Sequence, residues 1–130
     1  MRRPLSADAE KIRGEIKEMI RETATEKQTY SKKVDRLRSD DGRIMYAGDA
    51  LSKKVVELRD LLSIGTEFGW TVWHFPTAED LINENNSMYL VPLSSDSTIT
   101  PGGPLTEGYL IHITDKQTLS SCATIIIYMR

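Results

Sequence analysis

The sequence predicts an α+β protein in which a long N-terminal α-helix forms an oligomeric coiled coil and a small antiparallel β-rich head follows it. Three observations lead to this fold class. Apolar residues recur at seven-residue intervals through the first half of the chain, and β-type segments fill the second half. Residues 6–62 are rich in charge and contain no proline, whereas residues 66–130 hold both tryptophans and four of the five prolines. We therefore expect a coiled-coil oligomerisation stalk at residues 1–65 and a head domain at residues 66–130.

The stalk helix is expected to begin near Ser6. Ser6 can cap the helix, and Asp8 and Glu10 follow in the first turn, where acidic side chains favour the positive end of the helix dipole. The oligomerisation seam is predicted from four- and three-residue spacing. Its members are Ile12, Ile16, Met19, Thr23, Tyr30, Val34, Leu37, Ile44, Leu51, Val55, Leu58 and Leu62. Because so narrow an apolar stripe is buried only against another helix, we expect the chain to associate with copies of itself.

A helical hairpin is the alternative to one continuous helix. Asp41-Gly42 is a turn signal, and Gly48 is a second residue that weakens a helix, each glycine costing up to about 1 kcal/mol relative to alanine. The continuous helix is favoured because the four-three spacing keeps its phase across the suspected turn. Gly65 is expected to end this helix in the left-handed conformation. The composition of the seam leans slightly towards a dimer and leaves a trimer open.

Four strands are expected in the head, because four segments are rich in β-branched and aromatic residues. They are Trp70–Phe75, Met88–Leu93, Gly108–Thr114 and Ala123–Arg130. A helical turn is expected at Thr77–Ile82, and Pro92 predicts that the second strand lies at a sheet edge. The consecutive residues Ile125, Ile126 and Ile127 give the last strand two apolar faces, as in the middle of a sheet or against a neighbouring subunit.

The sequence contains no recognisable catalytic or metal-binding motif. The two histidines, His74 and His112, and the single cysteine, Cys122, have no metal-ligand or nucleophile spacing, so we expect neither an enzyme nor a cofactor. We expect Cys122 to be a small buried apolar residue. The possible ligand contacts are the rings of Trp70, Trp73, Tyr89 and Tyr109, which could form a platform for a sugar or a peptide. The alternative is that these rings pack in the core of the small head.

Charge and hydropathy give no sign of nucleic acid or membrane as a partner. The chain has 17 lysines and arginines against 19 acidic residues, and its formal charge is −2. It therefore lacks the overall positive field that attracts nucleic acid. The longest apolar stretch, Ala123–Met129, is shorter than the roughly 20 residues that span a bilayer, and no signal peptide is expected.

Short motifs in the C-terminal half carry a resemblance to a known group of proteins. They are Asp80-Leu81, Met88–Val91, Pro101–Gly103, Gly108–Ile111, Gln117 and Ile127–Arg130. Over about 50 residues, this half resembles the knob-type β domain of phage tail fibres and pyocin-like particles. The resemblance implies a homotrimeric, non-enzymatic attachment protein of the virion that binds a host-surface or virion protein. The alternative is a cytoplasmic coiled-coil adaptor, dimeric or trimeric, whose head binds a protein or peptide.

Overall fold

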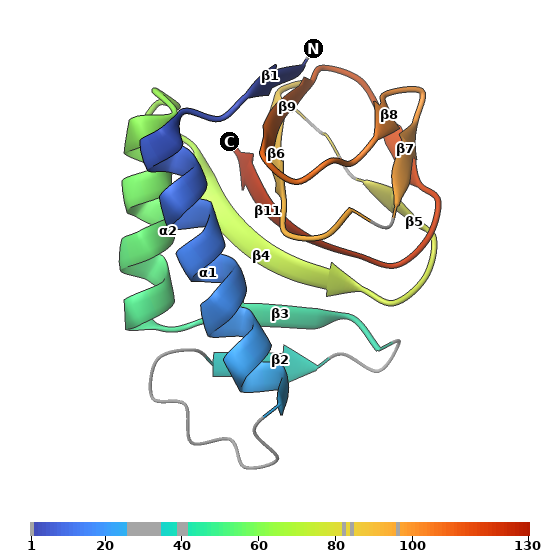
Figure 1. Ribbon diagram of the computed structural model, residues 1–130. Coiled ribbons are helices and arrows are strands. Elements are labelled where there is room, and N and C mark those ends of the chain that lie inside the picture. The colour runs from blue at the N-terminus through green and yellow to red at the C-terminus, as the bar shows by residue number, and fades with distance from the viewer. Residues whose placement is uncertain (1, 26–34, 39–41, 82, 84, 96) are drawn as a thin grey trace.

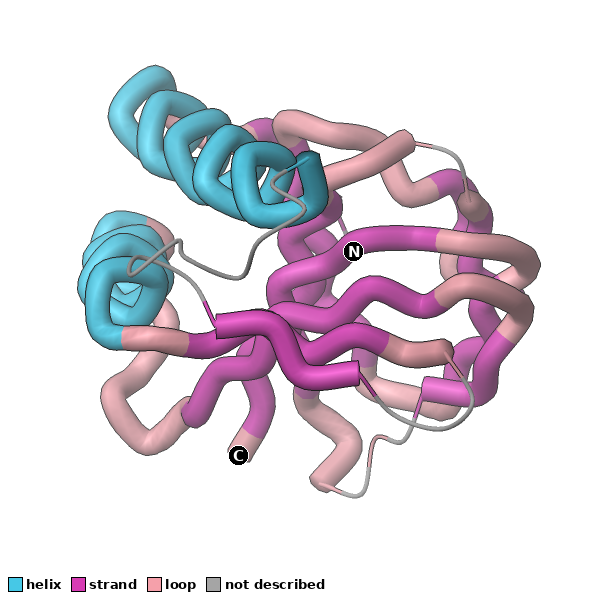
Figure 2. Tube along the Cα trace, turned by 90° about the horizontal axis from the view of Figure 1, so that it is seen from below, coloured by secondary structure: helices cyan, strands magenta, loops and turns pink. Residues whose placement is uncertain are grey.

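The computed structural model of the chain describes residues 2–25, 35–38, 42–81, 83, 85–95 and 97–130 (Figure 1). Within these residues, two helices and eleven short strands form three layers. A pair of helices covers one face of a seven-stranded antiparallel sheet, and a four-stranded sheet covers the other face. Figure 2 shows both helices on the same side of the strands.

The N-terminal half does not form the long coiled-coil helix that the sequence predicted. Helix α1 spans Ala7–Thr25 and helix α2 spans Asp49–Leu61, and the hairpin of strands β2 (Asp35–Arg38) and β3 (Ile44–Ala47) lies between them. Gly42 and Gly48 have φ angles of 88° and 113°, which no α-helix contains. The four-three spacing misled the prediction because an amphipathic helix that covers a sheet has the same spacing as a coiled-coil seam. The helical-hairpin alternative was wrong as well, since the connection contains two strands.

The predicted start of the N-terminal helix near Ser6 is confirmed. The predicted role of Gly65 as the left-handed residue at the end of the helical region is not confirmed. The Ala9 N–H donates to Ser6 Oγ at 3.2 Å, so Ser6 is the cap. The left-handed residue that follows α2 is Ser63, with φ of 59°, rather than Gly65. The Ile64 N–H bonds the Arg59 carbonyl at 3.1 Å, which is the closing bond of a Schellman motif.

The seven-stranded sheet has the order β1-β9-β6-β11-β4-β3-β2, and every pairing in it is antiparallel. Its remaining strands are β1 (Arg2–Pro4), β4 (Gly69–Phe75), β6 (Met88–Pro92), β9 (Tyr109–Ile113) and β11 (Ala123–Met129). All four strands predicted for the head are therefore present. Strand β6 lies between β9 and β11, so the edge position predicted from Pro92 was wrong; this proline is the last residue of its strand. Strand β11 is central, and the two-sided burial expected for it is confirmed.

The four-stranded sheet is built from short segments of the C-terminal half. Its strands are β5 (Glu79–Leu81), β7 (Thr98–Thr100), β8 (Gly103–Pro104) and β10 (Gln117–Leu119), in the order β5-β10-β7-β8. The helical turn expected at Thr77–Ile82 was wrong, because Glu79–Leu81 pairs with Leu119–Gln117 instead. Gly102 lets the loop before β8 pack closely: a Cβ atom there would lie 2.6 Å from Ile99 Cδ1.

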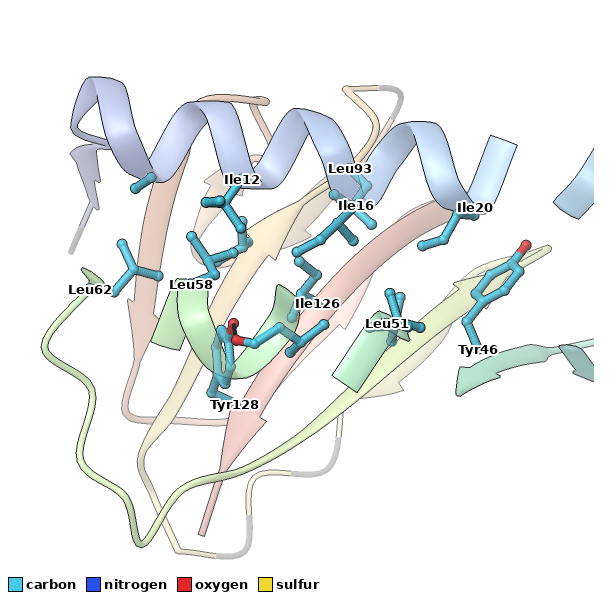
Figure 3. Close-up of a cluster of buried hydrophobic side chains, with 14 of the residues drawn as sticks. Ile12, Ile16, Ile20, Tyr46, Leu51, Leu58, Leu62, Leu93, Ile126 and Tyr128 are labelled. Carbon is cyan, nitrogen blue, oxygen red and sulfur yellow. Dashed lines mark hydrogen bonds between the residues drawn. The ribbon is translucent and has the colours of Figure 1, made fainter. Parts of the chain in front are cut away.

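Two hydrophobic cores lie on the two faces of the large sheet. In the helix-side core, Ile12, Ile16 and Ile20 of α1 point towards the sheet, where Ile126 and Tyr128 lie, as Figure 3 shows. The sheet-side core lies between the two sheets. Its members include Phe75, Leu81, Met88, Leu90, Ile99, Ile111, Leu119, Ile125 and Ile127. Because the helix-side core combines residues from both halves of the chain, residues 1–65 do not form a separate stalk.

Candidate functional site

The residues predicted to form the oligomerisation seam lie mostly inside the chain's own core. Ile12, Ile16, Ile44, Leu51, Val55, Leu58 and Leu62 are buried, and Met19 packs against them. The side chains of Thr23, Tyr30, Val34 and Leu37 lie outside the described part of the structure. The buried residues cover the large sheet and so do not face a second helix from another copy. Association into a dimer or trimer remains a prediction.

The four aromatic residues proposed as ligand contacts do not lie on one face. Trp70 and Tyr89 pack against the helix-side core, whereas Trp73 packs against the sheet-side core. Tyr109 is on the sheet side as well, because the next residue along β9, Leu110, belongs to the helix-side core. The sheet itself thus separates the four rings into two pairs.

A cavity of about 320 Å³ lies between α1 and the large sheet, and we call it the His74 cavity. Its described lining is formed by Lys17, Ile20, Arg21, Ile44, Tyr46, His74, Leu93 and Thr124. Three of these residues are direct neighbours across strands, since Ile44 pairs with His74 and His74 pairs with Thr124. The Leu93 N–H donates to the Thr124 carbonyl at 2.8 Å and extends this row. The floor of the cavity is therefore a continuous row across β3, β4, β11 and the end of β6.

The polar part of this floor is a hydrogen-bonded pair in mainly apolar surroundings. His74 Nδ1 lies 2.9 Å from Thr124 Oγ1, and both side chains are half-buried. Ile20, Ile44 and Leu93, which line the cavity around this pair, are buried. A hydroxyl and an imidazole can each donate or accept a hydrogen bond. The pair can thus bond either a donor or an acceptor on a ligand.

Two cations from α1 lie at the cavity, and both are already paired. Lys17 Nζ contacts Glu107 Oε1 at 2.6 Å, and Arg21 pairs with Glu18. Glu107 also accepts from Arg13 at 2.8 Å. Burial opposes the ionisation of Glu107, but the hydrogen bonds from Lys17 and Arg13 outweigh it and hold its pKa below the ordinary value. The bond to Glu10, together with Glu107, raises the pKa of Arg13. This cluster fixes the loop that carries Glu107 against α1.

The single cysteine of the chain does not lie where the sequence predicted it. Cys122 is exposed, so its predicted burial was wrong; Ala123, the next residue, faces the sheet-side core instead. In the described part of the chain, no three His, Cys, Asp or Glu side chains gather where they could hold a metal ion. The described helices also include none that is both long enough and apolar enough to cross a membrane.

Neither His74 nor the cavity around it was predicted from the sequence as a binding site. Ile44 had been assigned to a coiled coil, and Thr124 had no assigned role. The row Ile44, His74 and Thr124 joins strands that are 30 and 50 residues apart, so it depends on the order of the strands in the sheet. No local motif in the sequence carries that information.

The fold and the cavity together define a three-layer domain with a ligand-sized cavity on the helix side of its large sheet. Comparisons with protein-family models, with curated proteins and with solved structures find no match to this chain. The resemblance to phage tail-fibre knobs therefore remains a prediction from the sequence.

Proposed function

We propose that this chain is a non-enzymatic binding protein whose ligand is a small, mainly apolar molecule with one hydrogen-bonding end group. The observation that carries the proposal is the polar His74–Thr124 pair on the floor of a cavity that Ile20, Ile44 and Leu93 also line. A volume of about 320 Å³ lies at the lower end of the range for small-molecule sites. Such sites commonly combine apolar walls with a few polar groups that orient the ligand.

The arrangement of the lining gives the ligand a direction. Its apolar part would contact Ile20, Ile44 and Leu93, and burying apolar surface there supplies affinity at about 25 cal/mol per Å². Its polar end would bond the Thr124 hydroxyl or the His74 ring. We place the polar end at the floor rather than at α1 because Lys17 and Arg21 already bind Glu107 and Glu18.

Binding is favoured over catalysis by the composition of the lining. The described lining contains the imidazole of His74, the hydroxyls of Thr124 and Tyr46, and no carboxylate. A Thr–His pair resembles the start of a nucleophile and base arrangement, in which a third group orients the base, and no carboxylate of the described lining fills that role. Ligand binding requires only the hydrogen bonds that the pair can make.

The fibre and adaptor roles predicted from the sequence both assumed a coiled-coil stalk. The order helix, hairpin, helix replaces that stalk, so this chain has no long helical stalk that presents a head in its described residues. Binding of a host-surface, virion or other protein by the C-terminal half stays a separate prediction. A cavity of this size accommodates a small molecule rather than a protein surface.

Titration calorimetry with octanoate and with octanol tests the proposal, because the two probes share an apolar chain and differ in the charge of the end group. We expect saturable binding of at least one probe. Thr124→Val keeps the shape of the side chain but removes the hydroxyl, and should weaken binding about fivefold. Thr118→Val is the matched control, since Thr118 lies on β10 of the other sheet and bonds Asp80. The proposal fails if neither probe binds, or if both valine variants bind with the wild-type affinity.

A further inference from the structure

A second cavity lies at the opposite edge of the large sheet, where β1 runs beside β9 (Figure 1). It has a volume of about 150 Å³, and we call it the Tyr89 cavity. Its described lining consists of Arg2, Arg3, Tyr89, Leu110 and His112. None of these residues is among the described residues that line the His74 cavity.

Four of the five lining residues lie on the helix-facing side of the sheet. Leu110 belongs to the helix-side core, and Arg3 pairs with it across β1 and β9. His112 lies two residues further along β9, on the same face. It pairs with Tyr89 of β6, which packs against the same core. The register of three neighbouring strands thus brings one guanidinium, one aliphatic side chain and two rings together.

The charge on this face comes from Arg3 alone. Because side chains alternate along a strand, Arg2 lies on the opposite face, where a terminal nitrogen donates to the Gly102 carbonyl at 3.0 Å. A terminal nitrogen of Arg3 donates to the Leu62 carbonyl at 2.9 Å, just after α2. A guanidinium has five N–H donors, so this bond orients Arg3 and leaves donors for a ligand. In the described part of the chain, no carboxylate forms an ion pair with Arg3.

An ordered pair of rings gives the cavity an aromatic wall. The rings of Tyr89 and His112 stack with centroids 4.4 Å apart and planes inclined by 14°. Ser87 Oγ lies 3.2 Å from His112 Nε2 and helps to fix the imidazole. Burial lowers the pKa of His112, so near neutral pH the imidazole is mainly uncharged and Arg3 carries the positive charge. The buried side chain of Leu110 adds apolar surface between the two.

We propose that the Tyr89 cavity binds a small aromatic carboxylate, with the carboxylate on Arg3 and the ring against Tyr89 and His112. A guanidinium offers a planar pair of N–H donors that matches the two oxygens of a carboxylate. Arg3 and His112 are diagonal neighbours on adjacent strands, a spacing that long side chains bridge, so a carboxylate bonded directly to a ring can reach both. Aromatic rings attract each other beyond the area that they bury. The small volume favours a single ring over a larger polycyclic molecule.

Three probes separate the contribution of the charge from that of the ring. Benzoate has both features, benzyl alcohol has the ring without the charge, and acetate has the charge without the ring. Each probe is titrated at constant ionic strength while NMR follows the ring protons of Tyr89 and His112. We expect saturable shifts with benzoate and binding weaker by about tenfold or more for the other two probes.

Two arginine variants connect the response to one guanidinium. Arg3→Gln should weaken benzoate binding by about tenfold, because it removes a charge-assisted hydrogen bond. Arg2→Gln is the matched control, since it makes the same change one residue away on the opposite face and should bind benzoate nearly as the wild type does. Circular dichroism verifies folding. If loss of the Arg3–Leu62 bond unfolds Arg3→Gln, the comparison of the three probes on the wild type still tests the proposal.

The proposal is overturned if benzyl alcohol or acetate binds as tightly as benzoate, or if the benzoate shifts grow linearly and do not saturate. An equal loss of benzoate affinity in Arg2→Gln and Arg3→Gln would also overturn it. Binding of octanoate or octanol at the His74 cavity is measured separately. Failure of one site therefore remains distinguishable from failure of the other.

Discussion

The two faces of the large sheet bury their side chains in different ways, and β11 shows the difference within two residues. Ile125 faces the small sheet and Ile126 faces the helices, and both are fully buried. On the helix side, polar bonds cross between layers, since the Tyr128 hydroxyl donates to the Val55 carbonyl of α2 at 2.7 Å. On the sheet side, the buried amide of Gln117 bonds Gly102 and Asp115, which lie in loops beside its own sheet, and the bond from Arg2 of β1 across to the Gly102 carbonyl is exposed. The proposed binding site, the His74 cavity, lies on the helix side.

The widths of the sheet and of the helix pair explain why a cavity forms on the helix side. Seven strands about 4.8 Å apart span about 30 Å, whereas two helices, each about 10 Å wide, cover about 20 Å. The margins of the sheet therefore stay partly open. The His74 cavity lies at one such margin, towards β3 and β4. We infer that the sheet side mainly stabilises the fold and that the helix side binds ligands.

The largest expected effect tests this division directly. Ile125→Ala removes a fully buried side chain from the sheet-side core and should lower the free energy of unfolding by about 2–5 kcal/mol. The variant should bind octanoate or octanol as the wild type does, under conditions where it is folded. Thr124→Val, at the preceding residue, should do the reverse: a small change in stability and a loss of affinity. Urea unfolding measures the free energy of unfolding, and calorimetry measures the affinity for octanoate or octanol. If both variants lost stability and affinity to the same extent, the division between the two faces would be contradicted.

A smaller effect is expected at the bond that joins the sheet to α2. Burial raises the pKa of Tyr128, so its hydroxyl remains protonated and donates to Val55. Tyr128→Phe should reduce the free energy of unfolding by about 1 kcal/mol, the usual contribution of one buried hydrogen bond. Tyr109→Phe is the matched control, because Tyr109 is 38% exposed. Equal stability of the two variants in urea would show that the cross-layer bond contributes nothing.

The smallest effect concerns the acidic pH range. The pKa of Glu107 is lower in the folded chain than its ordinary value of 4.5, so its ion pairs stabilise the fold above that pH. This contribution is lost as the pH falls through the folded-state pKa, because between the two pKa values the unfolded chain binds a proton that the folded chain does not. Glu107→Gln should remove up to about 1 kcal/mol of stability near neutral pH. Its stability should also fall less steeply than that of the wild type on acidification. If the free energies of unfolding of the wild type and of Glu107→Gln fell in parallel between about pH 6 and about pH 3, the assignment of these ion pairs would be contradicted.

The strands of the C-terminal half could be predicted from the sequence, whereas the N-terminal half could not. Strands β4 and β11 contain runs of β-branched and aromatic residues, which determine a strand locally. Strand β3 is the short segment Ile44–Ala47 between charged stretches, and its burial depends on pairing with β4. The helices present the same spacing to a sheet as to another helix, so spacing alone could not identify what covers them. The His74 cavity was beyond prediction because its floor comes from strands far apart in the chain.

The most direct test of the division between the two faces is methyl NMR on isoleucine-labelled protein during titration with octanoate or octanol. Ile20 and Ile44 line the His74 cavity, whereas Ile99 and Ile125 lie in the sheet-side core. We predict saturable shifts of the Ile20 and Ile44 methyl signals while those of Ile99 and Ile125 stay in place. Shifts centred on Ile99 and Ile125, or no saturable shift of any isoleucine methyl with either probe, would contradict the assignment of binding to the helix side.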